Sequence, residues 1–219
     1  MISVVGIGPG NPDYVVPKAL RRIEQAEILI GGKRHLELFS RLPAQKLSWE
    51  KAEEARELFT PGKRVVILAS GDPGIFGILD TILSWVGREE IEVIPGVSVV
   101  QYMLAQLRLP AKDLVVLSVH GRMMNFVEVV RHHTLVAIFT DREHTPQFVA
   151  GKLLACGVED GEVYVGECLS YPEERITRFT VAELAREKRD FALNLVVIRR
   201  CGNLDRESPI RFLCGERCP

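Results

Sequence analysis

Three glycine-rich segments of this sequence have the residue types of a ligand-binding backbone. They occupy residues 6–11, 69–77 and 95–99, and each begins at or directly follows the end of a short apolar run. Glycine has no Cβ, so its backbone approaches a bound molecule closely. In open α/β sheets, ligands bind at the carboxyl ends of the strands. If the apolar runs are strands, the spacing predicts a small-molecule site built from three strand ends.

The first segment, Gly6-Ile7-Gly8-Pro9-Gly10-Asn11, differs from a dinucleotide-binding turn. Asn11 stands where the motif G-x-G-x-x-G needs its third glycine. Pro9 also removes a backbone N–H that would bind a pyrophosphate. The apolar run at residues 28–30 has no acidic residue at its end for a ribose hydroxyl. A nicotinamide oxidoreductase is therefore disfavoured, and the segment is either a tight strand-to-helix turn or another kind of ligand loop.

Asp72 is the acidic residue of the second segment, Ser70-Gly71-Asp72-Pro73-Gly74-Ile75-Phe76-Gly77. Asp followed by Pro is typical of the N-cap and first position of a helix, and this cap is one interpretation. The other is a site role, because a carboxylate near an ammonium group gains a charge-assisted hydrogen bond. The third segment, Pro95-Gly96-Val97-Ser98-Val99, is also a strand end that opens into a helix.

Basic residues follow two of the apolar runs. Lys33, Arg34 and His35 come after the run at 28–30, and His120 and Arg122 come after the run at 114–119. Both groups are candidates for holding an anionic ligand, since arginine pairs bidentately with carboxylates. A solvated charged turn is the alternative for each. Arg131-His132-His133 follows a helical pattern, so its charge is better explained by the helix dipole.

The elements that position these residues form an α/β pattern. Apolar, β-branched runs that are continuous rather than alternating predict strands buried on both faces, and helical patterns such as 97–107 lie between them. The predicted strands are 2–7, 28–30, 65–69, 91–94, 114–119, 135–139, 163–165 and 193–198. Alternation of strands and helices predicts mainly parallel sheets. Pro110 ends a helix near the middle of the chain, which predicts two α/β lobes, 1–110 and 111–219.

Composition narrows the function classes. The chain has 219 residues, with 28 Lys+Arg against 29 Asp+Glu, and this balance argues against a nucleic-acid partner. No apolar run approaches the ~20 residues of a membrane span. The five cysteines have no disulfide spacing, so we expect reduced thiols in a cytoplasmic protein. Cys201, Cys214 and Cys218 lack a second close pair, and we predict no metal site.

In order and spacing, the three glycine-rich segments resemble the tetrapyrrole (corrin/porphyrin) methylase family across the whole chain. The resemblance implies a two-lobed class III fold that binds S-adenosylmethionine (SAM) in the cleft between the lobes, and a homodimer. In that interpretation the 1–110 lobe carries the substrate side and the first cofactor motifs, and the 111–219 lobe closes the cleft. The implied cofactor-binding residues are Pro9, Gly71, Asp72, Pro73, Phe76, Ser98, Val99 and Phe139.

Two further segments, 30–36 and 117–122, resemble the subgroup that methylates C5 of the precorrin macrocycle in cobalamin biosynthesis. The substrate implied is cobalt-precorrin-7 or its metal-free equivalent, and a C15-methyltransferase/decarboxylase is an implied functional partner. The implied substrate-binding residues are Gly8, Gly10, Lys33, Arg34, His35, His120 and Arg122, with His120 also a candidate proton acceptor. Uroporphyrinogen-III methylation, methylation at another precorrin position, diphthine synthesis and a non-catalytic ligand-binding protein remain the alternatives.

Overall fold

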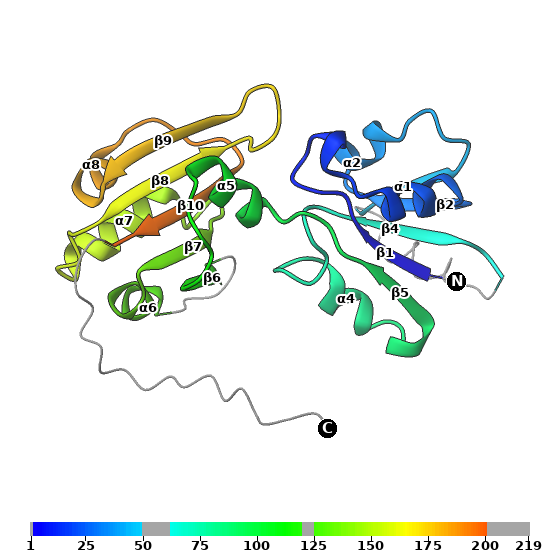
Figure 1. The fold of residues 1–219 in the computed structure, drawn as a ribbon, viewed down its shortest axis with the longest axis horizontal. Coiled ribbons are helices and arrows are strands. Elements are labelled where there is room, and N and C mark those ends of the chain that lie inside the picture. The colour runs from blue at the N-terminus through cyan, green and yellow to red at the C-terminus, as the bar shows by residue number, and fades with distance from the viewer. Residues whose placement is uncertain (1, 50–61, 120–124, 201–219) are drawn as a thin grey trace. The chain divides into compact units, whose positions relative to one another are not determined.

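The computed structural model describes residues 2–49, 62–119 and 125–200, and its chain divides into two compact units (Figure 1). The first unit comprises Met1–Ala111 together with Gly166–Arg175 and Ala192–Leu195, two segments from the second half of the sequence. The second unit comprises the rest of the chain. The assignment of substrate and cofactor roles to lobes 1–110 and 111–219 stays a prediction.

The first unit is built on a five-stranded sheet in the order β3-β2-β4-β1-β5. All the pairings in this sheet are parallel, with Ile2 of β1 opposite Val65 of β4 and Ile91 of β5. The carboxyl ends of these strands therefore share one edge. The strands are β1 (Ile2–Gly6), β2 (Ile28–Gly31), β3 (Gln45–Ser48), β4 (Val65–Ala69) and β5 (Ile91–Ile94).

Helices cover both faces of this sheet, which explains the continuous apolar runs. Successive side chains along a strand point to opposite faces of the sheet, so Val4 and Val5 belong to different hydrophobic cores. Ala19 and Ile23 of α1 pack on the first face and Ile82 of α4 on the second. The helices of this unit are α1 (Pro17–Glu24), α2 (Lys33–Leu38), α4 (Leu79–Leu83) and α5 (Val99–Leu107), with short 3-10 turns at Pro12–Tyr14 and Arg88–Glu90.

The second sheet has the strand order β6-β7-β10-β8-β9, and β6 pairs with β7 in parallel. Its core takes buried apolar side chains from β6, β7, β8 and β10 and from three helices. The strands are β6 (Leu114–Ser118), β7 (Leu135–Phe139), β8 (Glu162–Glu167), β9 (Arg175–Thr180) and β10 (Asn194–Arg199). The helices are α6 (Phe126–His132), α7 (Pro146–Ala155) and α8 (Val181–Arg186).

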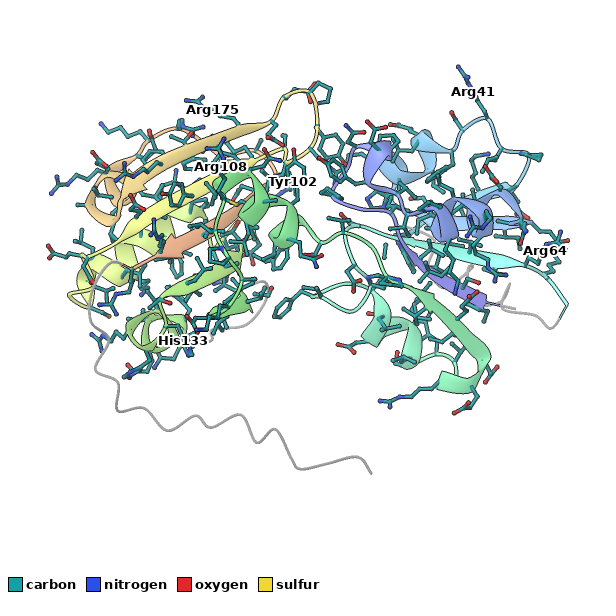
Figure 2. All side chains as sticks on the ribbon, in the orientation of Figure 1. Arg41, Arg64, Tyr102, Arg108, His133 and Arg175 are labelled. Carbon is teal, nitrogen blue, oxygen red and sulfur yellow. The ribbon has the colours of Figure 1, made fainter. Side chains whose placement is uncertain are left out.

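The predicted α/β class is confirmed, and the eight predicted strands are all present. Helix α5 ends as expected before Pro110, where Arg108 adopts a left-handed φ of +56° (Figure 2). The sequence analysis missed β3 and β9, whose residues are mostly half-buried or exposed. Among the described residues, no helix has the length and apolar character of a membrane span. No group of His, Cys, Asp and Glu in the described ranges could hold a metal ion, and Cys201, Cys214 and Cys218 lie outside those ranges.

Arg200 fixes the end of β10 against α6 in the second unit. Its guanidinium donates to both carboxylate oxygens of Asp160, at 2.9 and 2.8 Å, and to the backbone carbonyl oxygens of Val130 and Arg131. These carbonyls belong to the last turn of α6, where a cation also favours the helix dipole. Only 18% of the Arg200 side chain is exposed, so solvent screens these bonds weakly.

Replacing Arg200 with Ala should lower the free energy of unfolding by about 2 kcal/mol, because charged hydrogen bonds are lost and two helix-end carbonyls lose a donor. The measurement is urea unfolding of the full chain followed by circular dichroism. Arg199→Ala is the matched control, since the Arg199 side chain is 49% exposed and its ion pair with Glu162 spans 3.4 Å. Equal losses in the two variants would contradict the role given to Arg200.

Candidate functional site

Four strand ends bring the predicted site residues of the first unit to one edge of its sheet. The loop with Gly8 and Gly10 leaves β1, and the turn with Gly71 and Asp72 leaves β4. The turn that ends at Ser98 leaves β5. Lys33-Arg34-His35 forms the start of α2, directly after β2. Because the strands are parallel, these four segments lie at the carboxyl edge, where α/β proteins bind ligands.

The glycines of the three loops allow the loop backbones to touch. A Cβ added to Gly96 would overlap the carbonyl oxygen of Gly71, and one added to Gly6 would lie 2.5 Å from the Gly96 nitrogen. Gly71 adopts φ +63°, a conformation that L side chains rarely take. Gly8 and Gly71 form an antiparallel bridge, with N···O distances of 3.3 and 2.7 Å. Close backbone packing therefore requires several of these glycines even before a ligand is considered.

Asp72 ties two of these loops together. Its Oδ1 accepts a hydrogen bond from the Gly74 N–H at 2.8 Å, and its Oδ2 accepts one from the Gly96 N–H at 3.1 Å. The expectation that Asp72-Pro73 caps a helix is wrong, because residues 73–78 form turns and α4 begins only at Leu79. The carboxylate of Asp72 instead holds the β5 turn against the β4 turn.

Ser98 and Val99 open helix α5. The buried hydroxyl of Ser98 accepts from the Gln101 N–H at 3.1 Å, and the Gln101 side chain accepts from the Ser98 N–H at 2.9 Å, which makes a capping box. This cap uses the acceptor side of the Ser98 hydroxyl and leaves its proton for another partner.

Phe76 presents an apolar ring on the turn after β4. Its backbone has φ +49° and its side chain is 57% exposed, an unusual combination for phenylalanine. Strained backbone that presents an apolar side chain to solvent is typical of a binding site. Pro73 in the same turn is buried. A Cβ added to Gly77 would lie 2.5 Å from the Pro73 carbonyl oxygen, so the turn has no room for a side chain at this position.

The glycine loop after β1 does not offer all its N–H groups to a ligand. The Gly8 N–H donates to the Gly71 carbonyl, and the next element is the 3-10 turn Pro12–Tyr14 rather than an α-helix. The Gly8 N–H is therefore already used inside the protein. The Gly10 backbone packs against the Tyr171 ring, because a Cβ there would overlap that ring.

His35 differs from its two basic neighbours. Lys33 and Arg34 are exposed, whereas His35 is half-buried and its Nδ1 has no hydrogen-bond partner within the described residues. Burial, and then the positive charge of Arg34, lower the pKa of the His35 imidazole below its usual 6.5. Neutral imidazole at physiological pH follows, so the positive charge at this edge comes from Lys33 and Arg34.

The sequence analysis missed one segment of the site, residues 168–174. It belongs to the first unit, where the Ser170 hydroxyl accepts from the Asn11 N–H at 2.9 Å and Tyr171 meets Gly10. A local signal was Pro172, which restricts the backbone of Tyr171 before it and lies beyond the predicted strand 163–165.

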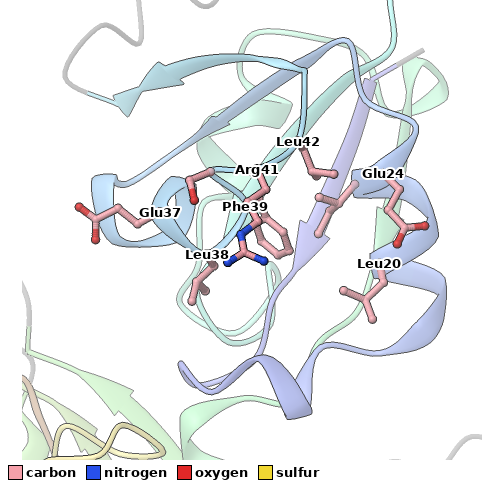
Figure 3. Close-up of a pocket in the computed structure, with 9 residues that line it drawn as sticks. Leu20, Glu24, Glu37, Leu38, Phe39, Arg41 and Leu42 are labelled. Atoms are coloured by element: carbon pink, nitrogen blue, oxygen red, sulfur yellow. The ribbon is translucent and has the colours of Figure 1, made fainter.

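A cavity of about 440 Å³ lies between the C-terminal parts of α1 and α2 (Figure 3). Leu20, Glu24, Leu38 and Arg41 are among its lining residues. In a parallel α/β unit the helices run back from the carboxyl edge, so their C-terminal ends lie toward the opposite edge. None of the predicted site residues that the structure describes lines this cavity.

Comparison with known proteins agrees with this arrangement. The family model of the Tetrapyrrole (Corrin/Porphyrin) Methylases matches residues 1–185. The chain belongs to the tetrapyrrole methylase family. Tetrapyrrole methylases use SAM, and this chain is a SAM-dependent methyltransferase of that family.

Three relatives of this tetrapyrrole methylase are informative. Cobalt-precorrin-7 C(5)-methyltransferase of Salmonella typhimurium is 35% identical over 208 residues, covering 90% of this chain and 98% of the relative. A precorrin-6Y C(5,15)-methyltransferase [decarboxylating] of a Sinorhizobium species is 30% identical over 181 residues, covering 80% of this chain and 44% of the relative. The fold matches uroporphyrin-III C-methyl transferase of Thermus thermophilus complexed with S-adenosyl homocysteine, with TM-score 0.73, 22% identity, and 90% and 91% coverage.

The remaining predicted site residues of this methylase lie elsewhere. Phe139 is half-buried at the end of β7, in the second unit. His120 and Arg122 lie outside the described residues. The structure therefore brings together the predicted residues of the first unit, and the roles of all the predicted site residues stay predictions.

Asp72→Asn should lower the free energy of unfolding by about 1–2 kcal/mol, because an amide replaces one of two accepting oxygens and leaves a loop N–H without its partner. Thermal or urea unfolding of the full chain measures this. Asp80→Asn, an exposed carboxylate in the first turn of α4, should cost about 0.5 kcal/mol or less. If Asp72→Asn had the same free energy of unfolding as the parent, the role of Asp72 in bridging the β4 and β5 turns would be contradicted.

Because the folded pKa of His35 is lowered, unfolding at low pH takes up a proton. Stability should therefore be highest above pH 6.5 and fall as the pH decreases from 6.5 to the folded pKa, with no further loss below both values. His35→Gln should remove this part of the pH dependence. An NMR titration of the imidazole should give a midpoint below 6.5, and Arg34→Ala should raise that midpoint. A midpoint at or above 6.5 in the parent would contradict the burial effect.

Proposed function

We propose that this chain transfers a methyl group from SAM to C5 of the precorrin macrocycle in cobalamin biosynthesis, with cobalt-precorrin-7 or its metal-free equivalent as substrate. The observation that carries the proposal is the 35% identity to a cobalt-precorrin-7 C(5)-methyltransferase across 98% of that relative's length. The similarity extends over 90% of this chain and is not confined to the three glycine-rich segments.

The residues at the carboxyl edge fit SAM chemically. SAM carries an ammonium group, a ribose and an adenine ring, and the edge offers the Asp72 carboxylate, the Ser98 hydroxyl proton and the exposed ring of Phe76. Asp72 retains lone pairs beyond the two backbone hydrogen bonds that it accepts. The residues that we propose to hold SAM are Pro9, Gly71, Asp72, Pro73, Phe76, Ser98, Val99 and, from the second unit, Phe139.

The chemistry asks mainly for positioning. The sulfonium of SAM supplies an activated methyl group, and a reduced tetrapyrrole carbon is an enamine-like nucleophile. The chain must hold the two in line and exclude water, and orientation alone lowers such barriers substantially. Asp72 and the packed glycines fix the loops on which this orientation depends.

The substrate is a polyanion, and an almost neutral protein needs local positive charge to bind it. Lys33 and Arg34 supply that charge at the carboxyl edge, with His35 beside them as a neutral hydrogen-bonding group. Gly8 and Gly10 would contribute the surface of their loop. His120 and Arg122 belong to the same proposal, with His120 as a candidate proton acceptor.

We also propose that the protein is a cytoplasmic homodimer with a functional partner enzyme. The partner is a C15-methyltransferase/decarboxylase. The C(5,15) relative supports it, because this chain matches only 44% of that longer protein.

Incubation of the protein with SAM and C5-unmethylated cobalt-precorrin should give a product with one additional methyl group by mass spectrometry, located at C5 by NMR. Calorimetry should show SAM binding near micromolar Kd, about −8 kcal/mol. A methyl at another ring position would replace the C5 assignment with another precorrin methylation. SAM binding without turnover would instead indicate a ligand-binding protein.

A further inference from the structure

We propose that Tyr171 is a positioning residue that holds the Arg34 guanidinium ready for a carboxylate of the tetrapyrrole. The inference deepens the proposed function, on which it rests for the identity of the ligand. Arg34 lies with its guanidinium carbon 5.7 Å from the centroid of the Tyr171 ring, within cation–π distance. Both residues belong to the first unit, although 137 positions separate them in sequence.

Arg34 is an exposed cation. Among the described residues, no hydrogen bond or ion pair joins its guanidinium to an acidic group. An arginine that stacks on an aromatic ring uses the face of its guanidinium and keeps the N–H donors in the plane available. The cation–π contact with Tyr171 therefore orients Arg34 and leaves its N–H donors available to an external carboxylate.

A second cation–π pair of this protein shows the contrasting arrangement. Arg189 lies 4.2 Å from the centroid of the Phe191 ring in the second unit. That guanidinium also forms an ion pair with Glu187 at 3.9 Å and a hydrogen bond with Thr177 at 3.4 Å. Its donors are engaged inside the protein, as expected for a purely structural arginine. Arg34 has an aromatic ring contact but, among the described residues, no carboxylate partner.

Hydrogen bonds of the neighbouring residues Ser170 and Glu174 fix the segment that carries Tyr171. Glu174 Oε2 accepts from the Ser170 N–H and from the Tyr102 hydroxyl, each at 2.6 Å, and Tyr102 projects from α5 (Figure 2). Burial and the Glu174 carboxylate raise the pKa of the Tyr102 hydroxyl, so it stays protonated and donates. Tyr102 in turn packs edge-to-face on Tyr14, with ring centroids 5.1 Å apart.

The segment that carries Tyr171 is strained. Cys168 has φ +46° and Ser170 has φ +69°, both in the left-handed region that non-glycine residues avoid. Such conformations persist only where surrounding contacts impose them, and they concentrate at functional sites. Here the contacts are those of Glu174 and of the Asn11 N–H with Ser170. This strained backbone places the Tyr171 ring against both Gly10 of the glycine loop and Arg34.

The test combines a binding measurement with activity. Fluorescence titration with uroporphyrin III, a polycarboxylate tetrapyrrole, gives a Kd that does not require turnover. Arg34→Ala should weaken binding about 5–20-fold, the range of a charged hydrogen bond at an exposed site. Tyr171→Leu should weaken it about 2–5-fold through loss of the cation–π contact. Tyr171→Phe keeps the ring and should behave like the parent.

A double-mutant comparison tests whether Tyr171 acts through Arg34 or only supports its own loop. In the Arg34→Ala background, Tyr171→Leu should cause no further loss of affinity, and the Kd for SAM should stay within twofold of the parent in every variant. Rising salt should weaken binding by the parent more steeply than by Arg34→Ala, because exposed charges are screened. Arg21→Ala, an exposed arginine in the last turn of α1, is the matched control and should change neither Kd.

The outcomes distinguish the two proposals. Additive effects of Tyr171→Leu and Arg34→Ala, or a weaker SAM affinity and lower Tm with unchanged porphyrin Kd, would overturn the positioning role and leave the methylation proposal standing. Coupled porphyrin binding without C5 methylation would overturn the proposed function and support the Arg34–Tyr171 pair as a tetrapyrrole anchor. A parent that binds no uroporphyrin III and methylates no precorrin would overturn both.

Discussion

The close approach of the Gly96 and Gly71 backbones is the constraint on which the candidate site depends. A Cβ on Gly96 would overlap the Gly71 carbonyl oxygen, and Gly71 adopts a φ of +63° that L side chains rarely take, so the loops after β4 and β5 meet without side chains between them. The Asp72 carboxylate then bridges the contact through the Gly74 and Gly96 N–H groups. Phe76, on the turn after β4, is 57% exposed. The outline of the site is thus set by backbone packing before any ligand-binding side chain is placed.

The strands that could be predicted from the sequence are those whose continuous apolar runs indicate burial on both faces of a sheet. Continuous apolar runs such as 65–69 have no other stable place than the middle of a sheet, and the fold class followed from them. Edge strands β3 and β9 lack that signal because solvent meets one of their faces. Asp72 stayed open between a helix cap and a site role, since Asp-Pro chemistry is the same at a helix start and in a turn. Tyr171 was missed because its partners, Gly10 and Arg34, are brought to it only by the tertiary fold.

The basic group at the start of α2 contains two different kinds of residue. Burial, and then the positive charge of Arg34, lower the pKa of the His35 imidazole and keep it neutral. The charge of Arg34 therefore attracts an anion and also adds to the effect of burial on the protonation state of His35. This arrangement concentrates positive charge on solvent-exposed groups and keeps the half-buried one uncharged, which avoids the cost of desolvating a second cation.

The return of residues 166–175 and 192–195 to the first unit has a consequence for how the protein is made. The glycine loop at residues 8–10 leaves the ribosome early, but its partners Ser170 and Tyr171 are synthesised about 160 residues later. Contacts of such long sequence separation form slowly, since a long loop must close before they stabilise anything. A nascent first half therefore forms its parallel sheet while the cover of its glycine loop is still untranslated, and maturation of the site is coupled to completion of the second sheet.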